Sequence, residues 1–309
     1  MALTLSILYR GPLSSCNYGC EYCPFAKRHE TAPELAADRR ALERFVAWVE
    51  ARPPGDRIAV LFTPWGEGLT RRWYRDALVR LSNLPQVERA AIQTNLAVPL
   101  DWVEAADRAK LAFWATFHPT EVDRVAFVAR CRELDRRGVR YSVGAVGLKE
   151  HRAEVAALRR ELAPHVYLWV NAYKREPGYY SAADLAHFAA VDPLFPVNNR
   201  RHPSLGRSCR TGRSVVSVAG DGAIRRCHFV PEVIGNLYEP GFAAALVERP
   251  CPAATCGCHI GYVHLDDLRL GPVFGGGILE RIPERPIGHD QVSSGSGGEG
   301  SSPALPPVG

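Results

Sequence analysis

The stretch Cys16-Asn-Tyr-Gly-Cys20-Glu-Tyr-Cys23 places three thiols within eight residues, shortly after the apolar run Leu3–Tyr9. That run has the branched and aromatic residues of a buried strand, so the thiols are predicted to lie in the loop after the first strand. Thiolates are the usual ligands of iron–sulfur clusters, and three ligands leave one iron of a four-iron cluster open to a substrate. A structural zinc completed by His29, or three unrelated buried cysteines, are the alternatives.

Beyond this loop, short apolar runs alternate with amphipathic stretches up to about residue 190. The strand candidates are Leu3–Tyr9, Ile58–Thr63, Ala90–Thr94, Lys110–Phe117, Arg140–Val146 and His165–Asn171. The helix candidates are Glu34–Glu50, Thr70–Leu81, a short segment after Pro99, a segment from Thr120 to Gly138, Glu150–Leu162 and Ala182–Ala190. Such alternation predicts a parallel sheet with right-handed crossovers. Six units are two short of the closed barrel, so we expect an α/β fold, a partial (β/α)6 TIM-like barrel, with a flat doubly wound sheet as the alternative.

The cysteine stretch, Cys-x3-Cys-x2-Cys with the aromatic Tyr22 before the last cysteine, resembles the signature of the radical S-adenosylmethionine (radical SAM) superfamily. The resemblance implies that Cys16, Cys20 and Cys23 hold a 4Fe–4S cluster whose open iron binds the amino and carboxylate groups of S-adenosylmethionine. It implies that one electron from the cluster breaks a carbon–sulfur bond, giving methionine and a 5′-deoxyadenosyl radical, and that Tyr22 contacts the adenine end. The protein would supply binding, orientation and protection.

A second segment follows the second strand candidate. In Thr63-Pro-Trp-Gly-Glu67, the pair Gly66 and Glu67 resembles the family's Gly-Gly-Glu-Pro segment, which meets the methionine ammonium. Trp65 and Gly68 depart from that pattern. A carboxylate beside a flexible glycine suits an ammonium ligand, and a solvated loop glutamate is the alternative.

Polar residues also follow the third and fourth strand candidates. Asn95, in a Gln-Thr-Asn segment similar to the family's Thr-Asn-Gly, and His118 are candidates for contacting the cofactor's carboxylate and ribose, because the carboxyl ends of parallel strands share one ligand-binding face. A cap or turn role is the alternative. The stretch Gly144–Glu150 resembles a Gly-x-Ile-x-Gly-x-x-Glu segment that packs on adenine, with one residue fewer between its glycines; only Val146 is carried over.

Five further cysteines lie beyond the predicted barrel: Cys209, Cys227, Cys251, Cys256 and Cys258. The pattern Cys209-x12-Gly222-x4-Cys227 resembles the opening of the auxiliary-cluster domains of radical enzymes, called SPASM in the full form and twitch in the shorter one. The twitch form fits the cysteine number better, which implies that four of the five hold a second 4Fe–4S cluster. A structural zinc site, with or without a histidine ligand, is the alternative.

These assignments divide the chain into parts. We expect a radical SAM partial barrel over residues 1–190, a linker over 191–208, an auxiliary iron–sulfur domain over 209–270 and a flexible, disordered tail over 271–309. A β-hairpin is predicted around Gly220-Asp221-Gly222. The Gly-, Ser- and Pro-rich composition after Gly275 is the basis for the tail.

Composition and charge narrow the classes of partner. The 38 Lys and Arg against 33 Asp and Glu give a net charge of +5, and the basic residues are interleaved with acidic ones, which favours solvated helix faces over a nucleic-acid surface. No apolar run reaches the ~18 residues of a membrane span, and the N-terminus lacks a signal-peptide pattern. We therefore expect a cytoplasmic protein, in which nine cysteines indicate metal binding or catalysis rather than disulfides.

The resemblance implies hydrogen-atom abstraction from a peptide or small-metabolite substrate, with an electron donor such as flavodoxin or ferredoxin. A radical enzyme acting on RNA and a non-catalytic iron–sulfur or zinc scaffold are the alternatives. The residues after the fifth and sixth strand candidates that could line a substrate pocket are Lys149, His151, Tyr173, Lys174 and Arg175.

Overall fold

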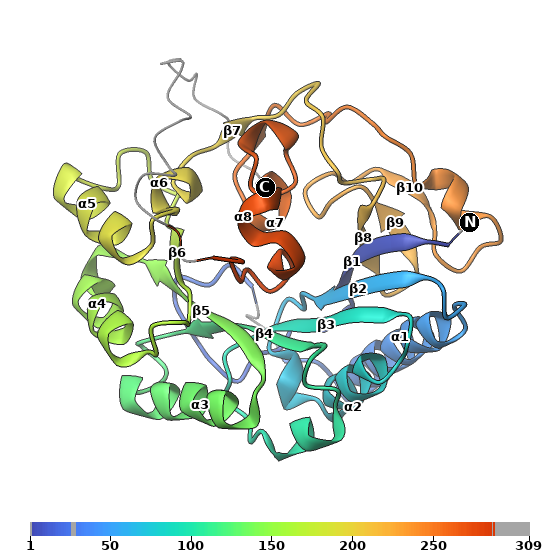
Figure 1. Cartoon of the computed structure of the whole chain (residues 1–309), viewed down its shortest axis with the longest axis horizontal. Coiled ribbons are helices and arrows are strands. Elements are labelled where there is room, and N and C mark those ends of the chain that lie inside the picture. The colour runs from blue at the N-terminus through green and yellow to red at the C-terminus, as the bar shows by residue number, and fades with distance from the viewer. Residues whose placement is uncertain (1, 26–28, 286, 288–309) are drawn as a thin grey trace.

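The computed structural model describes residues 2–25, 29–285 and 287. Its main element is a nine-stranded sheet in the order β10-β9-β8-β1-β2-β3-β4-β5-β6. The barrel strands, each parallel to the next, are β1 (Thr4–Arg10), β2 (Arg57–Phe62), β3 (Val87–Thr94), β4 (Leu111–Phe117), β5 (Arg140–Gly147) and β6 (Leu168–Ala172). Helices α1 (Ala32–Glu50), α2 (Arg72–Ser82), α3 (Arg124–Arg137), α4 (Arg152–Glu161) and α5 (Ala182–Val191) surround the curved sheet in Figure 1. The predicted α/β partial barrel of six strand–helix units is confirmed.

Local signals in the sequence set the ends of the helices. The Thr31 hydroxyl accepts from Glu34 N at 3.4 Å, and the Glu34 carboxylate accepts from Thr31 N at 2.8 Å, which forms a capping box for α1. The expectation that the fourth helix begins at Thr120 is wrong, because the Asp123 carboxylate caps Val125 N and the helix begins at Arg124. The short segment after Pro99 is a 3-10 turn over Asp101–Ala105.

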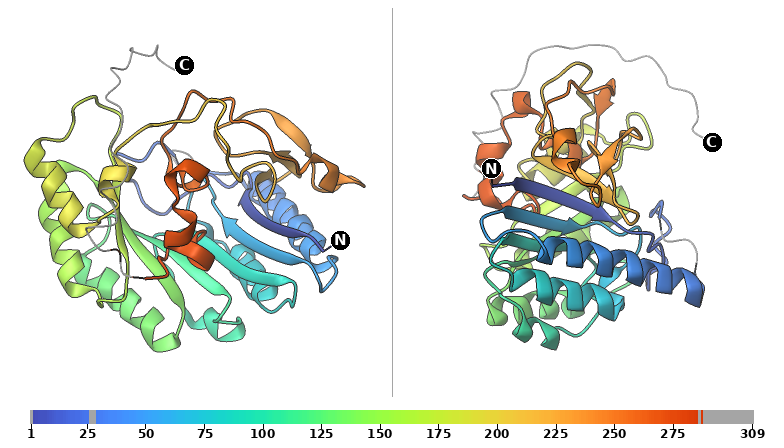
Figure 2. Two further views of the ribbon diagram at one scale, coloured as in Figure 1. Left: turned by 45° about the horizontal axis from the view of Figure 1, so that its top comes forward. Right: turned by 90° about the vertical axis from the view of Figure 1, so that its right-hand side faces the viewer.

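Apolar residues cover both faces of the sheet. The larger cluster joins the sheet to its helices, and the right-hand view of Figure 2 shows α1 and α2 lying along one face of the sheet. The inner, concave face carries Trp114 and Trp169, whose rings meet edge-to-face at 5.3 Å. Ile260 and Leu279, from the C-terminal quarter of the chain, pack on the same inner face. Side chains and the C-terminal segment therefore fill the barrel, as the central position of that segment in Figure 1 indicates.

The predicted hairpin is present, but it does not belong to a separate domain. Strand β8 (Val215–Ala219) pairs in parallel with β1, and β9 (Ala223–Arg225) and β10 (Val233–Asn236) continue the sheet. The expected boundary at residue 209 is thus corrected. A six-stranded partial barrel would leave the edge of β1 unpaired, and β8 satisfies those backbone groups.

The expected linker over 191–208 is a packed segment. It forms α6 (Phe195–Asn198) and β7 (His202–Pro203), which pairs with β11 (Thr255–Cys256). Phe195 and Asn198 are fully buried. Their burial explains why this Pro- and Arg-rich stretch is ordered.

The expectation of a tail from residue 271 is wrong for residues 271–285. This stretch contains α8 (Gly271–Phe274), which follows α7 (His259–Tyr262), and it buries Phe274 and Leu279. These apolar side chains among the glycines fix the backbone against the inner face of the sheet. The remaining tail residues, apart from 287, lie outside the described residues. No helix within the described part of the chain is long and apolar enough to cross a membrane.

Candidate active site at the carboxyl ends of the strands

The cysteine loop after β1 is held by the segment that follows β2. Trp65 N donates to Leu13 O at 3.1 Å, and Glu67 N donates to Ser15 O at 3.0 Å. Between these two bonds, a Cβ atom on Gly66 would lie 1.7 Å from Ser15 O. Only glycine allows this backbone approach, so Gly66 fixes the position of the residue directly before Cys16.

A second anchor comes from Glu30, which sequence reasoning missed. Its carboxylate accepts from Ser14 N, from Ser14 Oγ at 2.9 Å and from Ser15 N at 2.8 Å. Burial opposes the charge on Glu30, but hydrogen bonds from Ser15 and Ser14 lower its pKa below the usual value. An ionised Glu30 therefore closes the base of the cysteine loop, and no local pattern in the sequence indicates this contact.

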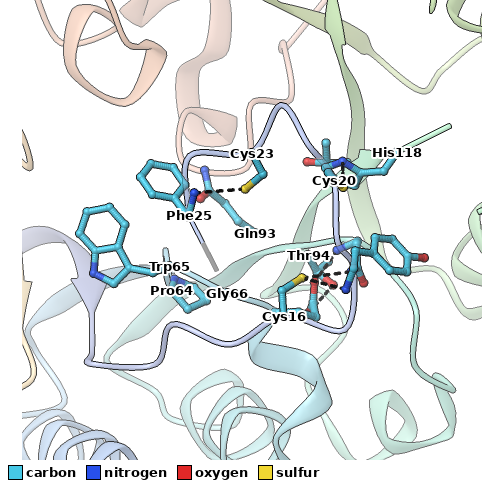
Figure 3. Close-up of a pocket in the computed structure, with 14 residues that line it drawn as sticks. Cys16, Cys20, Cys23, Phe25, Pro64, Trp65, Gly66, Gln93, Thr94 and His118 are labelled. Atoms are coloured by element: carbon cyan, nitrogen blue, oxygen red, sulfur yellow. Dashed lines mark hydrogen bonds between the residues drawn. The ribbon is translucent and has the colours of Figure 1, made fainter. Parts of the chain in front are cut away.

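A cavity of about 140 Å³ lies above these anchors, where β1, β2, β3 and β4 end (Figure 3). Its wall contains seven of the residues that the sequence singles out: Cys16, Cys20, Cys23, Gly66, Glu67, Asn95 and His118. Tyr22 and Val146 are not part of the wall. Within residues 2–25, 29–285 and 287, no three His, Cys, Asp or Glu side chains form a group that could hold a single metal ion. The three thiols are instead distributed around one cavity.

Each of the three sulfurs already faces a nitrogen. The Cys16 sulfur accepts from Tyr18 N at 3.4 Å, and the Cys23 sulfur accepts from Phe25 N at 3.4 Å. The Cys20 sulfur lies 3.4 Å from Nδ1 of His118. Nitrogen donors such as the backbone groups at Cys16 and Cys23 surround the thiolate ligands of iron–sulfur clusters and tune their potential. Three thiols around one cavity fit a 4Fe–4S cluster with an open iron.

Asn95 holds the middle of the same loop from the end of β3. Its Nδ2 donates to Asn17 Oδ1 at 3.0 Å and lies 3.9 Å from the Cys16 sulfur. From the segment after β4, the Glu121 carboxylate accepts from Gly19 N at 3.0 Å. Asn95 thus lines the cavity and contacts the cysteine loop, whereas Asn17 and Glu121 were not foreseen.

Glu67 is buried, with 3% of its surface exposed. Its carboxylate accepts from Leu69 N at 2.9 Å, from Thr94 Oγ1 at 2.9 Å and from Asn95 N at 2.6 Å. Burial raises the pKa of Glu67 to about 7 in spite of these donors. In this structure Glu67 joins the segment after β2 to the end of β3 at the cavity wall.

His118 connects the cavity to Tyr22. Its Nδ1 lies 2.9 Å from the Tyr22 hydroxyl, and the two rings are nearly parallel with centroids 5.9 Å apart. Burial lowers the pKa of His118 to about 4, so the ring is neutral at neutral pH. Tyr22 therefore does not line the cavity itself but contacts His118, which does. Val146 lies on β5 and is half-buried away from the wall.

The five C-terminal thiols lie near one another in pairs. Burial, followed by the thiols of Cys227, Cys258 and Cys209, raises the pKa of Cys256 to about 12. Burial is also the main cause of the raised pKa of Cys227, and Cys251 and Cys209 add to it. Cys227, after β9, therefore lies near Cys209, Cys251 and Cys256, and Cys256 on β11 also lies near Cys258.

Cys258 faces a different environment. It packs against the apolar inner face of the barrel. Burial raises the pKa of its thiol, while Lys174, Arg281 and Arg10 oppose that rise. Lys174 reaches this region by donating to Gly257 O at 2.5 Å. Cys258 is therefore directed toward the barrel interior and its cations.

Solved structures of anSMEcpe, a radical SAM enzyme, with bound AdoMet are similar to this chain. The complex with the Cp18Cys peptide has a TM-score of 0.50 at 16% sequence identity, covering 79% of this chain and 82% of that chain. The complex with the Kp18Cys peptide has a TM-score of 0.51 at 14% identity, covering 78% and 80%. No protein-family model and no curated protein sequence matches. At these identities the likeness concerns the fold, and the chain has the partial barrel of these AdoMet-bound structures.

Proposed function

We propose that this protein is a radical SAM enzyme that cleaves S-adenosylmethionine reductively and abstracts a hydrogen atom from its substrate. The observation that supports this most is the cavity at the carboxyl ends of the strands, which Cys16, Cys20 and Cys23 line with a nitrogen beside each sulfur. Ligands of parallel α/β folds bind at this end of the sheet. The fold shared with AdoMet-bound anSMEcpe agrees with the proposal.

A reduced 4Fe–4S cluster on the three thiols would supply one electron to the bound sulfonium, releasing methionine and the 5′-deoxyadenosyl radical that takes the substrate hydrogen. The chain's own residues orient and protect this chemistry. Gly66 and Glu30 fix the loop, Asn95 positions its middle, and the neutral ring of His118 lies against Cys20 and Tyr22. The electron must come from a donor, for which we propose flavodoxin or ferredoxin in the cytoplasm.

For the substrate we propose a peptide or a small metabolite. The peptide complexes of anSMEcpe support the first class. RNA is a weaker candidate, because several arginines of the helix surfaces pair with acidic neighbours. Arg137, for example, pairs with Asp101 at 3.0 Å and with Glu104 at 2.6 Å. Such pairing lowers the positive potential that RNA binding requires.

We further propose that Cys209, Cys227, Cys251 and Cys256 hold an auxiliary 4Fe–4S cluster and that Cys258 does not. Cys227 lies near Cys209, Cys251 and Cys256, whereas Cys258, a neighbour of Cys256 alone among them, also lies near Lys174 and the barrel interior. Four thiolates complete such a cluster without an open iron. The auxiliary site would then take up an electron or contact the substrate beside the barrel.

The test combines metal content with S-adenosylmethionine cleavage. After anaerobic reconstitution we expect about eight irons and eight sulfides per chain. With a strong reductant such as dithionite, the protein should form 5′-deoxyadenosine from S-adenosylmethionine. Cys20→Ala should lose about four irons and all cleavage, whereas Cys131→Ala, a change at a buried thiol of α3, should retain both.

Zinc in place of iron, or iron without any cleavage, would contradict the proposal and leave a non-catalytic scaffold. Cleavage that persists in Cys20→Ala would contradict the assignment of the ligands. Zinc at the C-terminal thiols together with about four irons would contradict only the assignment of an auxiliary cluster.

A further inference from the structure

The C-terminal segment brings two charged side chains into the interior of the barrel. Glu280 has no solvent-exposed surface, and Arg281 is 1% exposed. The backbone at Arg281 has φ of 56°, a left-handed conformation that non-glycine residues rarely adopt. Ile282 N donates to Gly277 O at 2.9 Å and closes the turn that holds this conformation. Unusual backbone conformations cluster at functional sites, so the buried position of the Arg281 cation suggests a function.

Glu280 has its own partners. Its carboxylate pairs with Arg89 at 3.1 Å and with Arg140 at 3.2 Å. Ser142 Oγ donates to the Glu280 carbonyl at 2.6 Å, which fixes the segment against β5. The carboxylate next to Arg281 in sequence is therefore engaged near the amino ends of β3 and β5.

In the part of the chain that the structure describes, Arg281 has no such partner. Its guanidinium carbon lies 4.6 Å from the centroid of Trp169 and 5.7 Å from that of Trp114. Among the described residues, Nε and Nη2 have no hydrogen-bond acceptor, and no acidic side chain forms an ion pair with the guanidinium. An unpaired charge in a buried place is costly, and the faces of two aromatic rings offset only part of that cost.

Arg281 also lies near the Cys258 thiol, Asp192 and His259, and none of these forms a hydrogen bond with it among the described residues. The buried Asp192 accepts from Tyr167 Oη at 2.6 Å and from the backbone nitrogens of Val170 and Leu194, both at 2.9 Å. His259 packs on the same Trp114 ring at 5.4 Å, and its Nε2 also lacks a partner within the described part of the chain. Two unpartnered polar groups thus border one pair of tryptophans.

We propose that Arg281, assisted by His259, binds a carboxylate group of the substrate inside the barrel. Nε and Nη2 form one edge of the guanidinium, and that edge matches the two oxygens of a planar carboxylate with two parallel hydrogen bonds. The edge has no solvent contact, so the carboxylate reaches it when the covering side chains move aside. This inference rests on the proposed function and narrows its substrate to a carboxylate-bearing molecule.

The position of the site agrees with this role. Trp114 and Thr116 are two residues apart on β4 and point to the same side of the sheet. Thr116 lines the cavity of the cysteine loop, and about 7 Å along the strand separates it from Trp114, on which the Arg281 cation packs. A substrate anchored by its carboxylate at Arg281 would extend toward the cavity where the proposed radical forms. The span suits a small metabolite or the last residues of a peptide.

The proposal can be tested by binding, without turnover. The reconstituted full-length protein would be heated with N-acetylglycine, with its uncharged amide or with inorganic phosphate, at constant ionic strength. Because a ligand that binds the folded state raises Tm, N-acetylglycine should raise Tm and the amide should not. An equal response to both compounds would overturn the proposal. A rise in Tm with phosphate alone would show that the site binds a phosphate group and not a carboxylate, which would also overturn the proposal.

Three variants test whether the rise in Tm with N-acetylglycine depends on the Arg281 guanidinium. Arg281→Met should abolish the response to N-acetylglycine and should raise the Tm of the ligand-free protein, because an unpaired buried charge is removed. Arg281→Lys, which retains the charge but not the paired edge, should weaken binding by about tenfold or more. Arg140→Met, the matched control at a neighbouring arginine, should keep the response.

A normal response in Arg281→Met, or a large fall in its ligand-free Tm, would show that the guanidinium serves the fold alone. If Arg281→Met does not fold, a response of Arg281→Lys equal to that of the original protein would overturn the proposal in its place. If the unmodified protein did not cleave S-adenosylmethionine, the proposed function would be rejected. The binding results would still stand, because they do not depend on turnover.

Discussion

Gly66 and Ser15 lie so close that a Cβ atom at position 66 would stand 1.7 Å from the Ser15 carbonyl oxygen. We predict that Gly66→Ala displaces the cysteine loop, lowers the free energy of unfolding by about 1–3 kcal/mol and reduces the iron content. Gly19→Ala is the matched control, because a Cβ atom at that position of the same loop meets nothing within 4 Å. Denaturant unfolding and iron analysis would measure both changes, and equal behaviour of the two variants would contradict the role of Gly66.

The C-terminal thiols can be separated by single substitutions. Cys251→Ala should lose about four irons per chain, since it removes one ligand of the proposed auxiliary cluster. Cys258→Ala should keep the iron content of the original protein, because Cys258 faces Lys174 and the barrel interior. Iron and sulfide analysis decides the point. The reverse pattern would place Cys258 in the cluster instead of Cys251.

His118 should give the iron-free protein a dependence of stability on pH. Burial lowers its pKa from 6.5 to about 4, so the unfolded chain binds a proton in this range that the folded chain does not. Stability should therefore fall as the pH falls from 6.5 to 4, by on the order of 3 kcal/mol. Denaturant unfolding across this range would show the loss, and His118→Gln should reduce it by the share of His118, while the other buried histidines such as His228 and His264 keep theirs. An identical pH profile in the variant would contradict the assignment.

Glu280 tests whether residues 271–285 belong to the core. Glu280→Ala should lower the free energy of unfolding by about 3–5 kcal/mol, because Arg89 and Arg140 would lose their buried partner. Glu43→Ala, at an exposed pair with Arg39, should leave stability nearly unchanged. Thermal unfolding of both variants makes the comparison. If Glu280→Ala left the stability unchanged, residues 271–285 would not contribute to the core, as expected for a flexible tail.

Local patterns in the sequence predicted the parts of the molecule that local forces determine. The capping box at Thr31, the alternation of strands and helices, and the cysteine loop after β1 depend on residues close together in the chain, so their spacing was informative. The candidate residues Asn95 and His118 were placed correctly at the cavity, because parallel strands direct their carboxyl ends to one side.

Contacts between distant segments were not predictable in this way. Glu30 and Glu121 reach the cysteine loop through side chains that carry no motif. The pairing of β8 with β1 joins residues about 200 positions apart, and the strand pattern alone does not say which edge a hairpin joins. The burial of Arg281 was hidden for a related reason, since a charged residue among glycines is typical of an exposed tail.

The pairing of β8 with β1 also bears on how electrons would travel. Arg10, at the end of β1 before the cysteine loop, lies beside Ala219 at the end of β8, and β9 leads directly to Cys227. His228 then contacts Thr63, next to the end of β2, at 2.9 Å. A hinge between two domains would let the gap between the two groups of thiols vary during turnover. Adjacent strands of one sheet keep that gap constant, so the tunnelling distance between the proposed clusters would be set by the backbone ladder itself.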